Sequence, residues 1–156
     1  MAASPDVTDR LMSLARLDPH PVHRPPQVWR VVLATALSIG CSLAADAALV
    51  AIGTREFPST VGYVHFAFHD YARLTVVGIV IAGAAWPVVA RLSSAPRWLF
   101  LRLAVAVSAV LLLPDLYILH QGQPLRAVAV LMAMHVAIGL ITYNLLVRLA
   151  PVRRPV

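Results

Sequence analysis

Long apolar segments alternate with short polar ones along the chain. Four segments are almost entirely apolar, and they cover residues 28–52, 72–90, 98–119 and 125–147. Each approaches or exceeds the roughly 20 residues that a helix, rising about 1.5 Å per residue, needs to cross about 30 Å of hydrocarbon. The pattern predicts an all-α fold, a four-helix transmembrane bundle, with no second domain.

Small and weakly polar residues recur on one face of each apolar segment. Lipid tails are as apolar as leucine, so helices in a membrane pack through such faces rather than through a hydrophobic drive. Residues three, four or seven apart share a helical face. The residues so placed are Thr35, Ser38, Ser42 and Asp46; Thr75, Gly78 and Ala82; Ser108 and Asp115; and His135, Gly139 and Thr142. We expect these four faces to meet inside the bundle.

The composition supports the membrane class. The 156 residues are 60% hydrophobic and 13% charged, with a mean hydropathy of +0.77, whereas about half of a soluble domain is apolar. The single cysteine, Cys41, lies inside the first apolar segment. It has no second cysteine with which to form an intramolecular disulfide, which excludes disulfide-forming oxidoreductases.

All basic residues are arginines, and their positions predict the orientation in the membrane. Three of them, Arg55, Arg73 and Arg126, flank one side of the predicted bundle. The other ten flank the opposite side: Arg10, Arg16, Arg24, Arg30, Arg91, Arg97, Arg102, Arg148, Arg153 and Arg154. The positive-inside rule then places both termini in the cytoplasm of a bacterium, with the bundle in its inner membrane. The net charge of +6 thus reflects topology, and we expect no nucleic-acid partner.

Both tails are predicted to lie outside the bundle. Residues 1–27 contain five prolines and scattered charges, which is typical of a disordered or surface-lying cytoplasmic tail. Residues 151–156 form a second, short cytoplasmic tail.

Each predicted helix contributes one charge to a layer near the outer side of the membrane. The acids are Asp46 and Asp115, and the bases are Arg73 and Arg126. One interpretation is structural, with ion pairs that set the helix register, because an unpaired charge in a membrane costs about 2.5–3.5 kcal/mol. The other is an outward-facing polar pocket that binds a lipid headgroup or a small ligand.

His135 lies near the centre of the fourth segment, at about the depth of Ser42 and Ser108. It fits either the pocket or a neutral imidazole bonded to a neighbouring hydroxyl. Further polar side chains, His69, Asp70 and His120, stand at the outer edge.

Histidine spacing does not define a metal or haem site. His65 and His69 are four residues apart and share a helical face, but no third ligand is specified by the sequence. A haem would require a second histidine at the depth of His135. We therefore predict no metal and no cofactor.

Two stretches read RLSSAPRWLFLRLAVAVSAVLLLP and AVAVLMAMHVAIGLITYNLLVRL. They resemble a bacterial family of small four-span membrane proteins known only as a domain of unknown function, and the similarity covers about residues 28–150. It rests on the helix start at Trp98, the segment from Ser108 to Pro114, and MHVAIG with His135. The resemblance implies the four-span architecture and a place for His135, and it implies no activity.

Three functions are compatible with the sequence. The first is a non-enzymatic accessory or partner-binding subunit. The second is a lipid or small-ligand binding protein with an outward-facing pocket. The third is a membrane enzyme that uses buried carboxylates on a lipid or isoprenoid. The expected partners are membrane lipids and either another protein or a second copy of the chain.

The orientation is testable with single cysteines. In a Cys41→Ser background, Pro5→Cys and Ser59→Cys should react with a membrane-impermeant thiol reagent from opposite sides of the membrane, Ser59→Cys from outside intact cells. Labelling of both from the same side would contradict the orientation inferred from the arginines.

Overall fold

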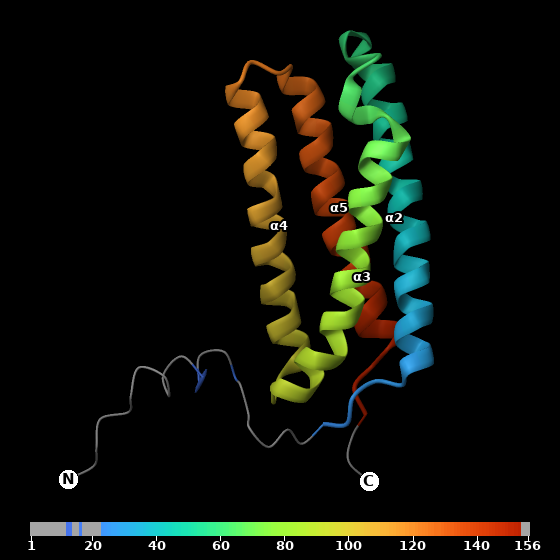
Figure 1. The fold of residues 1–156 in the computed structure, drawn as a ribbon, viewed down its shortest axis with the longest axis vertical. Helices are drawn as coiled ribbons and strands as arrows, with labels where there is room; N and C mark the ends of the chain where they lie inside the picture. The colour runs from blue at the N-terminus through green and yellow to red at the C-terminus, as the bar shows by residue number, and fades with distance from the viewer. Residues whose placement is uncertain (1–11, 14–15, 17–22, 154–156) are drawn as a thin grey trace, which may run out of the picture.

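The computed structural model describes Met12, Ser13, Arg16 and residues 23–153. Within this part of the chain, four long helices form a bundle: α2 (Val28–Glu56), α3 (Phe68–Leu92), α4 (Pro96–His120) and α5 (Leu125–Leu149) (Figure 1). Each is long and apolar enough to cross a membrane. The predicted four-helix transmembrane bundle is confirmed. Most of the predicted N-terminal tail, residues 1–27, lies outside the described residues. So do residues 154–156 of the predicted C-terminal tail.

Helices α3 and α4 are longer at both ends than the predicted apolar segments, and α2 and α5 are longer at their C-terminal ends only. Helix α2 continues past the predicted segment through Thr54 and Arg55 to Glu56, and α3 begins four residues before its segment, at Phe68. Two short 3-10 turns, η1 (Pro58–Thr60) and η2 (Val64–Phe66), then lead into α3. Proline occupies the first position of α4, where its missing N–H breaks no helical hydrogen bond.

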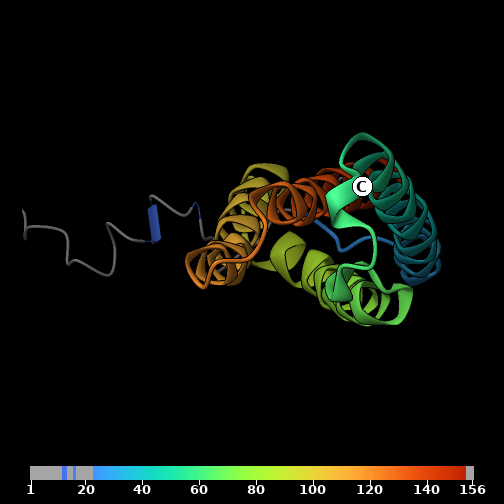
Figure 2. The same ribbon diagram turned by 90° about the horizontal axis from the view of Figure 1, so that it is seen from above.

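The bundle has two ends, which we call the terminal end and the loop end. The terminal end carries residues 23–28, 92–96 and 149–153, and the loop end carries residues 56–68 and 120–125. Helix α5 packs against both α2 and α4. Helix α3 crosses the bundle diagonally, beside α2 at the loop end and beside α4 at the terminal end (Figures 1 and 2).

Close helix contacts are made at three glycines. An added Cβ at Gly53 would lie 2.7 Å from the Val130 side chain, and one at Gly139 would lie 2.7 Å from Ser108 Oγ. At Gly83 an added Cβ would overlap the Thr35 hydroxyl. The prediction that Gly78 lies on the packing face of α3 is wrong: Gly78 is exposed, and an added Cβ there would meet nothing within 4 Å. That helix instead turns Thr75, Ile79, Gly83, Trp86, Val89 and Ala90 inward.

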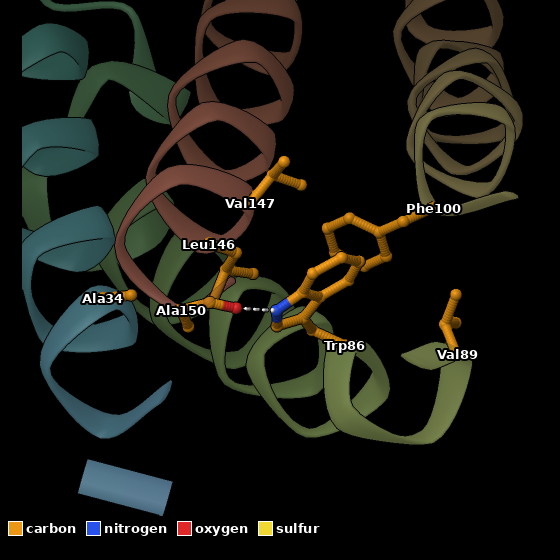
Figure 3. Packing of buried hydrophobic residues seen from close by; sticks show 7 residues of the cluster. All are labelled: Ala34, Trp86, Val89, Phe100, Leu146, Val147 and Ala150. Atoms are coloured by element: carbon orange, nitrogen blue, oxygen red, sulfur yellow. Dashed lines mark hydrogen bonds between the residues drawn. The ribbon is translucent and has the colours of Figure 1, made fainter. Parts of the chain in front are cut away.

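A buried cluster around Trp86 holds the helices together at the terminal end. The indole Nε1 donates a hydrogen bond of 2.7 Å to the carbonyl oxygen of Ala150, just past the end of α5 (Figure 3). The ring packs on Phe100 with centroids 5.0 Å apart, so α3, α4 and α5 are joined here. Beyond the helices, the backbones of Arg24 and Arg153 exchange two hydrogen bonds of 3.1 Å.

The glycine contacts predict a pair of contrasting variants on α2. Gly53→Ala should lower the free energy of unfolding by about 1–3 kcal/mol, because valine is stiff and the methyl group would overpack the α2–α5 contact. Gly40→Ala, at a position with nothing within 4 Å, should be neutral or stabilising by up to about 1 kcal/mol. Unfolding in detergent measures both, and equal effects would contradict the packing.

Candidate functional site

Three ionisable side chains from three helices converge in the loop-end half of the bundle. Asp46 of α2 is 0% exposed and Asp115 of α4 is 5% exposed. His135 of α5 contacts Asp115 directly and interacts electrostatically with Asp46. We call these three residues the acid–histidine cluster.

The contact between Asp115 and His135 joins α4 to α5. The Nδ1 atom of His135 lies 3.0 Å from Asp115 Oδ2 and also 3.0 Å from the carbonyl oxygen of Leu131. A carbonyl oxygen accepts only, so Nδ1 carries the proton in either charge state of the ring. The N–H points to Leu131, and Asp115 Oδ2 is left without a hydrogen-bond donor.

The depths of Asp115 and His135, counted in residues from the helix ends, do not predict this contact. Asp115 lies five residues before the end of α4, and His135 lies ten residues after the start of α5, a difference of about 7.5 Å along the helices. Side chains tilt toward the N-terminus of their own helix. In this antiparallel pair the tilt moves Asp115 deeper and His135 shallower, so the two side chains meet.

Asp46 is supported from α3. The hydroxyl of Thr75 donates a hydrogen bond of 3.0 Å to Asp46 Oδ2. The other carboxylate oxygen, Oδ1, is buried without a hydrogen-bond partner, as is the hydroxyl of Ser42 one turn away on α2. Thr75 belonged to a predicted packing face but not to the predicted site, because a lone threonine in a membrane helix carries no signal of its partner.

Aromatic residues cover the cluster at the loop end. Tyr63, Phe66 and Tyr71 pack against a small core of Val130, Leu131 and Met134. Burial raises the pKa of the Tyr63 hydroxyl, and the nearby Asp115 carboxylate adds to the rise. This hydroxyl therefore stays protonated at physiological pH, and it is buried without a hydrogen-bond partner. The exposed His65 also interacts electrostatically with Asp115.

The expected pairing of the acids with arginines is wrong. Arg73 and Arg126 are both exposed, and neither forms an ion pair with any described residue. Arg126 instead lies over the ring of Phe57, with 5.1 Å from its Cζ atom to the ring centroid. The long side chain of an arginine near the start of a membrane helix reaches the membrane surface, which costs less than desolvating its charge.

The other predicted polar residues lie apart from the acid–histidine cluster. His69 and Asp70 form a pair at 3.2 Å with exposed side chains, and His120 is exposed at the end of α4. Ser108 packs against Gly139, two turns from Asp115 toward the terminal end. In residues 23–153, no group of three or more histidine, cysteine, aspartate or glutamate side chains has the arrangement of a metal site.

Comparison with known proteins identifies the family but no activity. The family of unknown function DUF6069 matches residues 14–151, which is most of the chain. The chain belongs to this family, and the resemblance seen in the sequence is confirmed. No curated protein and no solved structure matches it.

The contact geometry predicts which residues are energetically coupled. Asp115→Asn and His135→Gln, made singly and together, should be non-additive in the free energy of unfolding by about 0.5–1.5 kcal/mol. Asp115→Asn with Arg126→Gln should be additive within about 0.5 kcal/mol. Equilibrium unfolding in mixed micelles provides both cycles, and coupling to Arg126 rather than His135 would overturn the assignment.

Proposed function

We propose that this DUF6069 protein is a membrane-embedded binding protein whose acid–histidine cluster holds the cationic, hydrogen-bond-donating group of a small molecule or lipid headgroup. The protein lies in the bacterial inner membrane with both termini in the cytoplasm. The cluster, at the loop end, then faces the outer leaflet.

The observation that carries this proposal is a set of buried acceptors without donors. Asp46 Oδ1 and Asp115 Oδ2 have no hydrogen-bond partner among the described residues. The buried hydroxyls of Ser42 and Tyr63 have no hydrogen-bond partner there either. Leaving one such group unsatisfied costs about 1–3 kcal/mol, and more when it is charged. An ammonium group, with several N–H donors, would satisfy both carboxylates at once.

The charge of the cluster favours a cation. Two carboxylates face one histidine, and the loop-end arginines Arg55, Arg73 and Arg126 are exposed and form no ion pair with the acids. With both acids ionised, even a protonated His135 leaves one negative charge. A buried carboxylate without a partner takes up a proton instead, so a positive ligand group would supply the partner that keeps both acids ionised.

The packing of α4 is compatible with entry from the side. Within this helix, Pro96, Phe100 and Asp115 are buried, so in its loop-end half Asp115 alone is buried. The same half stands beside α5 and away from α3 (Figures 1 and 2). A small displacement of α4 would expose the cluster to the outer leaflet.

The orientation in the membrane is supported by the arginines. Among the described residues, Arg16, Arg24, Arg30, Arg91, Arg97, Arg102, Arg148 and Arg153 belong to the terminal end. Arg55, Arg73 and Arg126 belong to the loop end. This asymmetry follows the positive-inside rule with the terminal end in the cytoplasm.

A second candidate function, an accessory subunit that binds another membrane helix, is favoured by one face of α2. Ala36, Gly40, Ala44 and Ala48 repeat every four residues and are all exposed. An added Cβ at Gly40 would meet nothing within 4 Å. Such a face lets a second helix approach closely, whether from another protein or from a second copy of the chain.

Native mass spectrometry of the protein extracted gently from its own membrane tests the binding function. The wild type should retain a small molecule with a basic nitrogen. Asp46→Asn and Asp115→Asn should lower its occupancy at least about tenfold, because truncating a buried charge pair costs 2–5 kcal/mol or more. The matched control is Asp70→Asn, at a half-buried acid paired with His69, and it should retain the molecule.

Thermal unfolding of each variant separates loss of the molecule from loss of the fold. No small molecule in the wild type, or equal retention by all variants, would contradict the proposal. A co-purifying protein without a small molecule would favour the accessory subunit.

A further inference from the structure

A groove runs along the terminal-end half of the bundle between α2 and α3. Its volume is about 610 Å³, and its lining comes from α2, from α3 and from residues 25–27 and 153. Helix α3 diverges from α2 toward the terminal end on its diagonal course (Figure 1). Thr35 and Gly83, where the two helices touch, belong to its lining. We propose that this groove holds an acyl chain of an anionic phospholipid whose phosphate is bound by Arg91 and Arg153.

The walls of the groove are apolar and face outward from the bundle. Most of the lining side chains are aliphatic, and Val28, Val32 and Val80 are 78%, 62% and 49% exposed. In a membrane-spanning bundle, a groove of this kind between two helices is bathed by lipid tails. Its natural occupant is therefore a hydrocarbon chain rather than a water-soluble molecule.

The length of the groove matches one leaflet. On α2 the lining extends from Val28 to Ile39, which is about 17 Å along a helix. Half of a hydrocarbon core of about 30 Å is about 15 Å. A single acyl chain whose headgroup lies at the terminal end fits this span.

Two arginines mark the headgroup end. Arg91, in the last turn of α3, and Arg153 both line the groove. The Nε of Arg153 donates a hydrogen bond of 3.1 Å to the Pro25 carbonyl, which orients its guanidinium while leaving the terminal nitrogens for a phosphate. Arg91 is exposed and forms no ion pair within the described chain.

A smaller pocket of about 180 Å³ adjoins the groove and adds a third arginine. Arg30 and Arg153 are among its lining residues, and the Nε of Arg30 is buried without a hydrogen-bond partner. The described acids, Asp46, Glu56, Asp70 and Asp115, all belong to the other half of the bundle. These guanidinium groups thus have no described carboxylate nearby, and a phosphate complements them in charge and geometry.

Lipid titration of the full-length protein in a neutral detergent tests the proposal. The probes are phosphatidylglycerol and phosphatidylcholine with identical palmitoyl and oleoyl chains, and native mass spectrometry measures their apparent Kd values. The wild type should bind phosphatidylglycerol more tightly. Arg91→Gln should weaken that binding about fivefold, the effect of one basic residue near an anionic lipid surface, and leave phosphatidylcholine unchanged.

Matched variants separate the groove from general surface charge. Arg148→Gln removes an exposed arginine at the same end but outside the groove, and it should bind as the wild type does. Ala84→Phe, which fills the groove, should weaken both lipids, whereas Ala109→Phe on the exposed face of α4 should not. Glycerol phosphate, the headgroup without chains, should not compete.

Several results would overturn the groove assignment. They are equal affinity for the two lipids, equal losses in Arg91→Gln and Arg148→Gln, and full binding by Ala84→Phe. If Ala84→Phe fails to fold, as lipid-free thermal unfolding would show, Arg91→Gln decides the outcome. The groove and the acid–histidine cluster lie in opposite halves of the bundle, so failure of one assignment does not affect the other.

Discussion

The hydrocarbon core of a bilayer contains almost no water, so each polar group placed there needs a partner from the protein or from a ligand. In a helix, the backbone N–H and C=O groups form hydrogen bonds with one another. Asp46 accepts a hydrogen bond from Thr75 at one oxygen only, and Asp115 Oδ2 lies 3.0 Å from His135 Nδ1 without accepting its N–H. Asp115 is also the one buried residue in the loop-end half of α4. The same contact thus positions a helix and leaves carboxylate oxygens available, which links the packing of the bundle to the proposed binding of a cation.

The two ends of the bundle are built differently. At the terminal end, Trp86, Phe100 and Ala150 join three helices through ring packing and a hydrogen bond to a backbone carbonyl. At the loop end, α4 stands away from α3 (Figure 2) and is held to α5. The loop-end half of α4 is held by the contact of Asp115 with His135 and by Ile118, which packs against the core of Val130, Leu131 and Met134. Asp115 is the one buried residue in this half of α4, so this half opens at lower cost than the terminal end. This difference suits a binding site at the loop end.

Two proposed sites of opposite charge lie at opposite ends of the molecule. The acid–histidine cluster favours a cation, and the arginines beside the α2–α3 groove favour a phosphate. The course of α3 bears on both, because it brings Thr75 to Asp46 in the loop-end half and places Gly83 against Thr35 in the lining of the groove. A change in the tilt of α3 would therefore alter both sites.

The number of helices, their approximate bounds and the membrane class follow from the sequence, because the length of an apolar run is a local property. The candidate residues Asp46, Asp115 and His135 also follow, since an ionisable side chain in such a run is rare and costly. Their partners do not. Arg73 and Arg126 were the opposite charges expected in the same layer, yet flexible arginines reach the surface and the tilt of each Cβ brings Asp115 to His135. The inward face of α3, with Gly83 rather than Gly78, likewise depends on how the helix crosses its neighbours. Local composition determined what spans the membrane, and only the packing of helices decided which side chains meet, because contact depends on rotation and tilt that no single segment encodes.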